Sequence, residues 1–382
     1  MSLFELSADH LEIKETIHRI AQDKIKPLAI EIDEKAEYPW EVLHLLSEYG
    51  FMGVNMPEEY GGSGLDLLSF CTVVEEIARV CASSSQVVVV QELGALPIMI
   101  GGSGELKQRI LPDVATGKKV IAYGLTEPGA GSDVKSLKTK AERDGDHYIL
   151  NGQKMFISNG GVADYYTVFA NTDKGISVFV VEKDTPGFEV GKLETKMGIK
   201  GSPTAQLFIE NCRIPKENLV GEEGEGWLLA MKTFDKSRPT VAAQALGIAQ
   251  GAFDVALQYV QEREQFGKPI GSFQGLQFML ADMATQIEAA RGLVYRAAAK
   301  VNALSSTGKN PELTQASSMA KMFASDVAMK VTTDAVQMLG GYGYVQEYHV
   351  ERMMRDAKIT QIYEGTNQIQ RLIIARNLLG GS

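Results

Sequence analysis

The sequence has 382 residues, and at about 150 residues per domain this length predicts two or three packed units. Its 45 % hydrophobic and 23 % charged residues are typical of a globular protein and exclude a disordered or collagen-like chain. The 38 basic and 48 acidic residues give a net charge of −10 and form no Lys/Arg-rich block. We therefore expect neither nucleic acid nor a membrane surface as a partner.

Residues 9 to about 116 are predicted to be helical, because apolar side chains from Leu11 to Ile20 and from Val42 to Leu46 recur every three or four residues. Breaks are expected at Pro27, Pro39, Pro57, Pro97 and Pro112. The glycines clustered in residues 59–64 predict a loop. We assign residues 1–118 to an N-terminal helical domain.

Residues 119–229 are predicted to form a β domain. Short runs rich in β-branched and aromatic residues occur at 148–150, 154–157, 165–169, 176–181 and 205–209. Asn151-Gly152 between the first two runs favours a two-residue hairpin turn. The connections are too short for helical crossovers, so we expect a small antiparallel sheet or barrel.

Residues 230–382 are predicted to be a helical bundle, since only Pro269 and Pro311 interrupt the sequence after Pro239. Helices are expected at about 240–265, 273–304, 312–338 and 366–379, and four such helices suit a bundle. Arg238 should mark the start of the first, because it precedes a proline. The predicted fold class is mainly α with a central β domain.

Cysteine and histidine usage bears on compartment and metal binding. The three cysteines, Cys71, Cys81 and Cys212, form no C-x-x-C pair and favour a reducing compartment. The five histidines lack the spacing of metal ligands, so no metal site is expected. The N-terminus does not resemble a signal peptide, and no apolar run approaches the length of a membrane span. We expect a cytoplasmic protein.

The usual phosphate-binding and hydrolase motifs are absent: there is no G-x-G-x-x-G after a strand, no P-loop and no G-x-S-x-G. A candidate ligand loop is Tyr123–Asp133. There Gly129 and Gly131 let the backbone approach a ligand closely, and Thr126 and Ser132 offer hydroxyls. The residues alone leave a plain surface turn open as the alternative.

Glu364 is the candidate base, lying between an apolar-aromatic run and a glycine. Thr366 resembles the N-cap of a following helix. A partly dry pocket would raise the pKa of Glu364 above its ordinary value of about 4.3 and make it a better base. The alternative is an acid at a helix start, favoured there by the helix dipole.

Four motifs in fixed order make the sequence resemble the acyl-CoA dehydrogenases, FAD enzymes of fatty-acid and amino-acid breakdown. They are Tyr123-Gly-Leu-Thr-Glu-Pro-Gly-Ala-Gly-Ser-Asp133, Phe234-Asp-Lys-Ser-Arg238, Arg263-Glu-Gln-Phe-Gly-Lys-Pro269 with Gln274, and Gln337-Met-Leu-Gly-Gly-Tyr-Gly343 with Tyr363-Glu-Gly-Thr366. The resemblance covers nearly the whole chain. It implies the same order of helical domain, β domain and four-helix bundle.

The resemblance implies FAD as the cofactor. The residues implied to lie near the flavin ring are Tyr123, Leu125, Thr126, Gly131, Ser132, Phe156, Ile157 and Ser158. The other implied cofactor-binding residues are Arg263, Gln265, Phe266, Phe273, Gln274, Gln337, Leu339, Gly340, Gly341, Thr366 and Gln368. The 263–266, 274 and 337–341 segments resemble residues that bind FAD across a subunit interface, so a homotetramer built as a dimer of dimers is expected. A solvated cation at a helix end is the alternative for Arg263.

The implied reaction is α,β-dehydrogenation of an acyl-CoA thioester. Glu364 would remove the α-proton while a hydride leaves the β-carbon for flavin N5, and the Glu364 N–H would help hold the thioester oxygen. Residues implied to contact CoA or the substrate are Ser132, Ser202, Asp235, Arg238, Gly365 and Arg376. Ser237 stands where another subgroup carries its base, so the sequence resembles the short- and medium-chain, butyryl-CoA dehydrogenase-like subgroup. An electron-transfer flavoprotein is the implied electron acceptor.

Several alternatives remain open within this resemblance. They are an acyl-CoA oxidase-like flavoprotein that passes electrons to oxygen, a glutaryl-CoA-type decarboxylating enzyme, and a catalytically silent flavin-binding scaffold. The decarboxylating enzyme needs a further cation, and the Val87–Leu93 segment offers no arginine. Within that segment Gln91 and Glu92 interrupt the apolar run. They either shape the acyl pocket for a short, branched or cyclic group or face outward from a helix.

Overall fold

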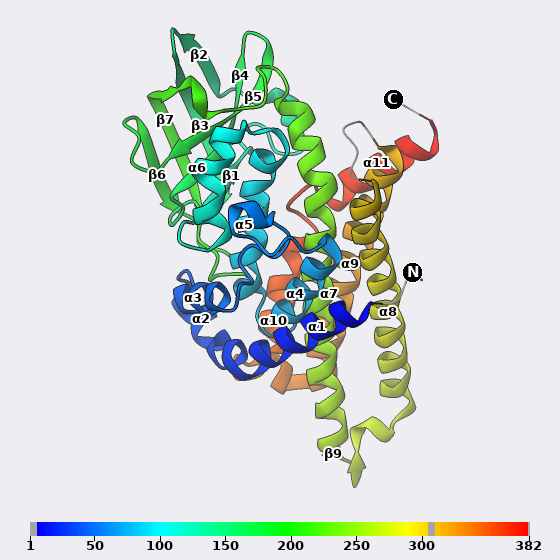
Figure 1. Cartoon of the computed structure of the whole chain (residues 1–382). Coiled ribbons are helices and arrows are strands. Elements are labelled where there is room, and N and C mark those ends of the chain that lie inside the picture. The colour runs from blue at the N-terminus through cyan, green and yellow to red at the C-terminus, as the bar shows by residue number, and fades with distance from the viewer. Residues whose placement is uncertain (1–5, 305–309, 381–382) are drawn as a thin grey trace.

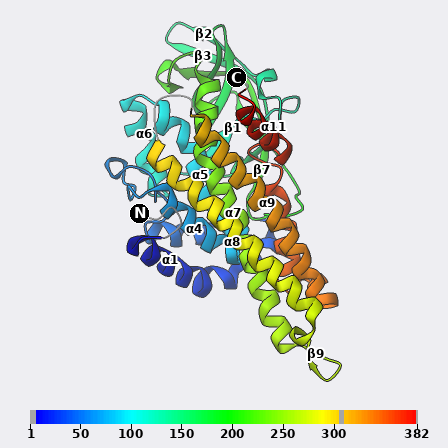
Figure 2. The same cartoon turned by 90° about the vertical axis from the view of Figure 1, so that its right-hand side faces the viewer.

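Three groups of elements follow one another along the chain: helices, then a sheet, then long helices (Figure 1). The computed structural model describes residues 6–304 and 310–380. The sheet lies at one end of the molecule, and α7 (Gly226–Glu262) runs from beside it to the far tip at β9 (Glu264–Gln265) (Figures 1 and 2). The predicted fold class, mainly α with a central β domain, is confirmed.

The N-terminal helices are α1 (Ala8–Ile20), α2 (Ala29–Lys35), α3 (Trp40–Glu48), α4 (Leu67–Val80), α5 (Ala82–Gly101) and α6 (Gly104–Ala115). The expected breaks at Pro97 and Pro112 are wrong, because these prolines lie inside α5 and α6. Most of α5 is buried against α4, α6, α7 and β1 (Ile121–Gly124). This burial outweighs the cost of about 3 kcal/mol for a proline within a helix.

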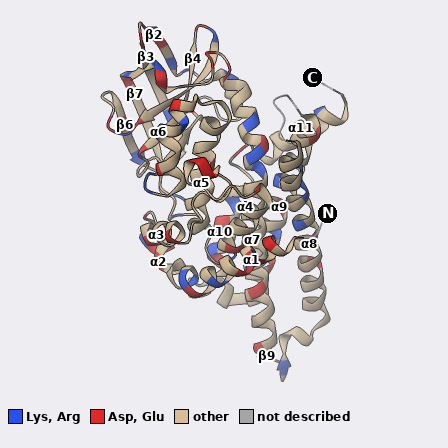
Figure 3. Cartoon of the chain, viewed as in Figure 1, with Lys and Arg blue, Asp and Glu red and all other residues tan. Residues whose placement is uncertain are grey.

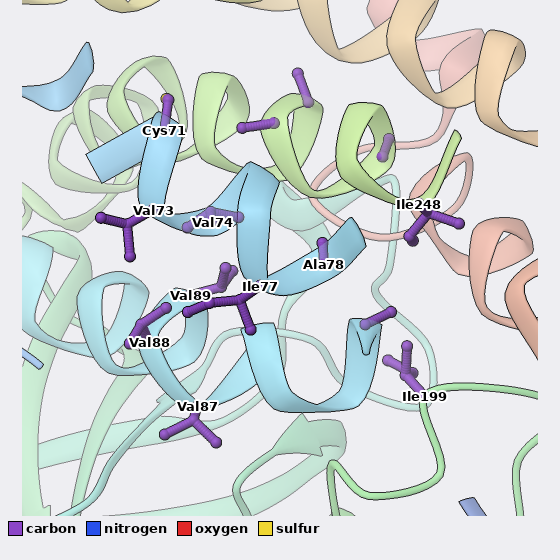
Figure 4. Close-up of a cluster of buried hydrophobic side chains, with 14 of the residues drawn as sticks. Cys71, Val73, Val74, Ile77, Ala78, Val87, Val88, Val89, Ile199 and Ile248 are labelled. Carbon is purple, nitrogen blue, oxygen red and sulfur yellow. The ribbon is translucent and has the colours of Figure 1, made fainter. Parts of the chain in front are cut away.

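The core of the helical region forms where α4, α5 and α7 meet. Figure 4 shows apolar side chains of α4 between those of α5 and Ile248 of α7. Two glycines of α7 allow this approach. A Cβ at Gly247 would lie 2.2 Å from the Glu75 carbonyl oxygen, and one at Gly251 would lie 2.0 Å from that of Arg79. The N-terminal helices therefore pack directly against the backbone of the bundle.

The remaining strands of the main sheet are β2 (Lys140–Asp144), β3 (His147–Ser158), β4 (Tyr165–Thr172), β5 (Gly175–Glu182), β6 (Phe188–Leu193), β7 (Thr204–Pro215) and β8 (Leu219–Val220). Their order is β6-β7-β3-β2-β4-β5-β8, with β1 beside β4. The sheet is mixed where an antiparallel one was expected, because β1 and one residue of β2 pair with β4 in parallel. The β2–β3 hairpin lies between β1 and its partner β4 in the sequence.

Asn151-Gly152 does not form the expected hairpin turn. β3 runs straight through both residues, and the turn between β2 and β3 lies at residues 145–146. The pairing of β3 with β7 shifts register between Leu150 and Gly152. A Cβ at Gly152 would lie 2.5 Å from Thr139 Oγ1, so a close approach of chains explains this glycine.

The C-terminal bundle is formed by α7, α8 (Gln274–Leu304), α9 (Pro311–Leu339) and α10 (Val350–Thr360), with α11 (Asn367–Leu378) packed on α9. Helix α10 was not expected from the sequence. A hairpin of β9 and β10 (Lys268–Pro269) joins α7 to α8. The domain boundaries at 118 and 229 remain a prediction, and the second falls in the first turn of α7.

The expected helix start at Arg238 is wrong, because α7 continues through Pro239. A proline has no N–H to donate to the carbonyl four residues earlier, which here belongs to Asp235. Ser317 of α9 replaces that donor, and its Oγ lies 2.7 Å from the Asp235 carbonyl oxygen. A neighbouring helix thus satisfies the group that the proline leaves free.

Within residues 6–304 and 310–380, α5 and α7 are the helices that are long and apolar enough, by length and composition, to cross a membrane. Their apolar windows are 78 % and 72 % buried within the fold, so packing accounts for their composition. Acidic and basic residues are interspersed over the ribbon (Figure 3).

Candidate active site

A cavity of about 750 Å³ opens between α5, β1 and its following loop, β3, α7 and the segment from Tyr363 into α11. Predicted residues that line it are Tyr123, Leu125, Thr126, Gly131, Ser132, Phe156, Ile157, Ser158, Arg238, Glu364, Gly365 and Arg376. Segments that lie more than 200 residues apart in the sequence therefore meet at one site.

Four other predicted residues do not line the cavity. Ser202 is buried in the loop before β7, where its carbonyl accepts from Lys196 Nζ at 2.7 Å. Asp235 lies behind Arg238, 3.6 Å from its guanidinium. Thr366 is the N-cap of α11, as predicted, and Gln368 is exposed.

The remaining predicted cofactor residues lie at the opposite end of α7. They are Arg263, Gln265, Phe266, Phe273, Gln274, Gln337, Leu339, Gly340 and Gly341, around the β9–β10 hairpin and the end of α9. At about 1.5 Å per residue, α7 separates Arg263 from Arg238 in the cavity by about 38 Å. These predicted residues are therefore not brought to the cavity within one chain.

Glu364 faces the cavity from the turn between α10 and α11. Burial raises its pKa, whereas the Ser237 hydroxyl, which donates to Oε2, and the charges of Arg238 and Lys321 oppose that rise. The raised pKa confirms the expectation from the sequence. Glu364 lies two residues before Thr366, the N-cap of α11, and has a φ of 51°, so it is not in the first turn of that helix.

Arg238 is a buried cation in the cavity wall. Its Cζ lies over the Phe234 ring, 5.4 Å from the ring centroid, and its Nη1 lies 3.5 Å from Ser318 Oγ. Burial lowers its pKa, and its Nε has no hydrogen-bond partner in the part of the chain that the structure describes. The cavity therefore has a cationic donor close to Glu364.

Phe156 forms an aromatic wall beside the cavity. It lies on a β-bulge of β3, where pairing with β7 shifts register, and its φ is 59°. A positive φ is strained for an aromatic residue. The bulge turns the ring out of the sheet and leaves it 59 % exposed. Such strain at a cavity is typical of a ligand-contacting residue.

A buried ion pair that was not predicted from the sequence supports the loop after β1 and the bulge of β3. Lys154 Nζ on β3 lies 2.7 Å from Glu127 Oε1 and 3.2 Å from the Leu125 carbonyl oxygen. Glu127 also accepts from Thr139 N–H at 3.0 Å. The Met155 N–H donates to the carbonyl of Thr126 at 2.9 Å. The loop after β1 and the bulge of β3 are thus held together.

Gln91 and Glu92 are buried, so the expectation that they face outward from a helix is wrong. Neither lines the cavity, and a role in shaping the acyl pocket stays a prediction. Gln91 Nε2 donates to the carbonyls of Val114 and Lys119 at 2.8 and 2.7 Å, and connects α5 to the last turn of α6 and to the segment before β1. Glu92 accepts from Asn55 and Thr240 at 2.6 and 3.0 Å, and burial raises its pKa to about 8. Both residues are internal packing and hydrogen-bonding groups.

Three family models match the chain: the acyl-CoA dehydrogenase N-terminal domain over residues 7–118, the middle domain over 122–212 and the C-terminal domain over 224–379. The chain belongs to the acyl-CoA dehydrogenase family. Members of this family are oxidoreductases that act on CH–CH donors.

Similar proteins match over almost their whole length. The probable acyl-CoA dehydrogenase FadE25 of Mycobacterium tuberculosis (strain H37Rv) is 52 % identical, over 99 % of this chain and 97 % of its own. The cyclohexane-1-carbonyl-CoA dehydrogenase of Geobacter metallireducens is 50 % identical, over 99 % of both chains. The butyryl-CoA dehydrogenase structure from Megasphaera elsdenii has a TM-score of 0.94 and 46 % identity, over 98 % of this chain and 99 % of its own.

Two further similar structures have descriptions that name an electron transferring flavoprotein or FAD. A chain from a structure described as the electron transferring flavoprotein of Acidaminococcus fermentans has a TM-score of 0.95 and 51 % identity, over 98 % of this chain and 99 % of its own. The Bacillus anthracis acyl-CoA dehydrogenase complexed with FAD has a TM-score of 0.93 and 37 % identity, over 98 % of this chain and 68 % of its own. This acyl-CoA dehydrogenase is FAD-dependent, as members of its family are.

The cavity of this acyl-CoA dehydrogenase fits a flavin and a thioester. Phe156 offers an aromatic face, and Thr126 and Ser158 offer hydroxyls. The hydroxyl of Tyr123 is buried at the cavity and has no hydrogen-bond partner among the described residues. A buried hydroxyl without a partner is costly, so a polar ligand is expected to meet it.

Three polar or aromatic residues of this acyl-CoA dehydrogenase cavity, Gln86, Lys135 and Trp227, were not predicted from the sequence. Lys135 Nζ lies 5.0 Å from the centre of the Trp227 ring, and Gln86 lies on α5. Trp227 is one of two tryptophans and precedes a quoted motif, which was an available signal. No local pattern distinguishes Lys135 or Gln86.

Proposed function

We propose that this enzyme converts a short- or medium-chain acyl-CoA, linear, branched or cyclic, to the trans-2-enoyl-CoA, with Glu364 removing the α-proton. The observation that supports this most strongly is the position of Glu364. Asp133 and Glu364 are the carboxylates that line the cavity within the described residues, and Asp133 is exposed. Only Glu364 has the burial that raises the proton affinity of a base.

Bound FAD would supply the acceptor for the β-hydride at flavin N5. The residues of this chain that would hold its ring are those of the wall, Thr126, Phe156 and Ser158, with Tyr123 close by. Glu364 would take the α-proton on its carboxylate. Its backbone N–H donates to no other described backbone group, and we propose that it binds the thioester oxygen, where negative charge develops.

The CoA part of the substrate would enter between the loop after β1 and α11. Exposed Ser132, Lys135 and Arg376 line the cavity there and suit the phosphates of CoA. Arg238 lies deeper, beside Glu364. We propose that it stabilises charge near the reacting carbons.

The acyl group would lie against α5. Helix α5 lines the cavity with the apolar residues Val89, Val90 and Leu93 and with the polar residue Gln86. Gln86 Nε2 donates to Tyr363 Oη at 3.2 Å in a cluster that also includes Gln244. A long alkyl chain gains little from contact with such a cluster. This supports compact acyl groups, as do the relatives named for cyclohexane-1-carbonyl-CoA and butyryl-CoA.

We also propose a homotetramer in which a second copy completes the cofactor site. Predicted cofactor residues lie about 38 Å from the cavity along α7. Large apolar side chains are exposed around that end, with Phe266 91 % and Tyr344 84 % exposed. If the Arg263→Ala variant loses both its FAD and its tetrameric state, the result would support the proposal. An FAD-replete monomer of the unaltered protein would contradict it.

An electron-transfer flavoprotein is the proposed electron acceptor, supported by the match to the Acidaminococcus fermentans structure. The proposed compartment is the cytoplasm, since Cys71, Cys81 and Cys212 are all free and buried.

Anaerobic mixing of the FAD-loaded enzyme with butyryl-CoA tests the base assignment. Bleaching of the flavin absorbance should be fast in the unaltered enzyme and reduced at least about a hundredfold in Glu364→Gln. The exposed Glu142→Gln on β2 is the control and should bleach normally. Undiminished bleaching in Glu364→Gln would refute the assignment. Initial rates with butyryl-, hexanoyl-, octanoyl-, isobutyryl- and cyclohexanecarboxyl-CoA would then define the acyl preference.

A further inference from the structure

The turn that carries Glu364 has an unfavourable backbone conformation. Glu364 has a φ of 51° and Gly365 a φ of 91°, both in the left-handed region. Glycine adopts this region readily, whereas glutamate does so at a cost. Such a conformation persists only where surrounding groups hold it. Whatever holds this turn also determines where the Glu364 carboxylate points.

Lys321 of α9 donates hydrogen bonds to this turn and to the helix that follows it. Its side chain is completely buried, and its Nζ donates to the Gly365 carbonyl at 2.8 Å and to Asn367 Oδ1 at 3.0 Å. Asn367 is the first residue of α11, so one ammonium group joins the turn to the helix that follows it. Gln370 adds a second contact, with Nε2 donating to the carbonyls of Glu364 and Gly365 at 3.2 and 2.9 Å.

The use of a lysine here is unusual, because an uncharged donor could bond to the same carbonyl at lower cost. No carboxylate lies within ion-pair distance of Lys321 Nζ in the described part of the chain. Burial lowers the pKa of Lys321 to about 7, with the Arg238 charge acting in the same direction and Glu364 and Asp326 opposing. The two acids favour the ammonium form of Lys321, and one of them, Glu364, is the proposed base.

The charge of Lys321 acts back on Glu364 and favours its carboxylate form. Other groups facing Glu364 come from several elements. They are Ser237 and Arg238 of α7, Glu92 of α5, Tyr123 of β1 and the neighbouring Tyr363. Arg238 and Lys321 are the cations that act on Glu364, and of these two only Lys321 also bonds to the backbone of the turn. It therefore couples the position of the base to its ionisation.

We propose that Lys321 is a positioning residue for catalysis: its hydrogen bonds hold the Glu364–Gly365 turn so that the carboxylate faces the α-carbon, and its charge keeps that carboxylate ionised. This inference rests on the proposed role of Glu364 as the base.

Lys321→Met and Lys321→Gln test the proposal, with Lys330→Met as the matched control. Lys330 lies on the same helix but is half-exposed and pairs with Asp334. The rate of flavin reduction by butyryl-CoA per bound FAD, KM, FAD content and thermal unfolding are measured, the first two across pH 5.5 to 9. Glu364→Gln is run alongside.

In Lys321→Met the rate per bound FAD should fall by roughly ten- to a hundredfold with little change in KM. The acid limb of kcat/KM should move to higher pH by roughly one unit, because a cation that favoured the carboxylate is gone. Lys321→Gln keeps an N–H donor without the charge. It should recover most of the rate but retain the displaced acid limb. Lys330→Met should match the unaltered enzyme.

An unmoved acid limb together with an unaltered rate per bound FAD, in whichever Lys321 variant folds, would overturn the proposal. A fall in melting temperature and FAD content alone would then show a purely structural lysine. Failure of the base assignment is recognised separately, because Glu364→Gln would then reduce its flavin at the normal rate.

Discussion

Glu92 is expected to destabilise the folded protein at neutral pH. Burial raises its pKa from an ordinary 4.5 to about 8, so the folded state binds a proton at Glu92 that the unfolded state releases between these values. The free energy of unfolding therefore falls as pH rises through this range. At about 1.4 kcal/mol per pH unit, the cost relative to an uncharged isostere reaches about 3 kcal/mol at pH 7.

Glu92→Gln removes this cost while retaining the shape of the protonated acid. The Gln oxygen can accept from Asn55 Nδ2 as Glu92 Oε1 does, and the Gln amide can donate to Thr240 once its hydroxyl rotates. We therefore expect Glu92→Gln to exceed the unaltered protein in stability by up to about 3 kcal/mol at pH 7. The gain should be near zero at pH 4.5.

Thermal unfolding of the FAD-loaded protein at pH 5, 6, 7 and 8 measures this effect. The difference in Tm between Glu92→Gln and the unaltered protein should increase at each step. Glu142→Gln, an exposed change on β2, should show no such trend. A difference that is constant or decreases with pH would mean that Glu92 is ionised in the folded protein, and the reasoning would fail.

Two further changes test buried polar contacts. Lys154→Met should lower the free energy of unfolding by about 3 kcal/mol and weaken FAD binding, because it leaves the carboxylate of Glu127 buried without its cation. Measurements of FAD content and Tm would check this, and an unchanged Tm would contradict it. Ser317→Ala should cost about 1–3 kcal/mol by leaving the Asp235 carbonyl without a donor. In Pro239→Ala the restored N–H can donate to the Asp235 carbonyl, so Ser317→Ala should then cost less stability. Denaturant unfolding measures both losses, and equal losses with Pro239 and with Ala at this position would contradict the role of Ser317.

The order of domains was predictable because each has its own local pattern. Helical spacing, alternating β-rich runs and a long stretch with few prolines are all visible over ten to thirty residues. The errors occurred where a tertiary contact outweighed a local preference. Pro239 lies inside a helix because Ser317 supplies the missing donor, and Gly152 lies inside a strand because Thr139 passes over it.

The candidate site was predictable where its residues form contiguous motifs. Glu364 and the loop after Tyr123 could be identified from their neighbours in sequence, and the structure places them at the same cavity. Gln91 and Glu92 could not be interpreted in this way. Their position in an apolar run was visible, but their partners on three other segments were not.

Lys154 and Lys321 show most clearly what a sequence lacks. Each is completely buried and donates to a main-chain carbonyl of a segment that lines the cavity, that of Leu125 or Gly365. An ammonium has three donors on a flexible stem, so it can bond to a carbonyl and to a side chain at once, with Glu127 in one case and Asn367 in the other. Before folding, neither differs from any other of the 38 basic residues. Their importance arises only when the fold removes them from water, since a buried cation must keep its few partners in place. The segments that would contact the flavin and the thioester are therefore each stabilised by a buried lysine that donates to a main-chain carbonyl.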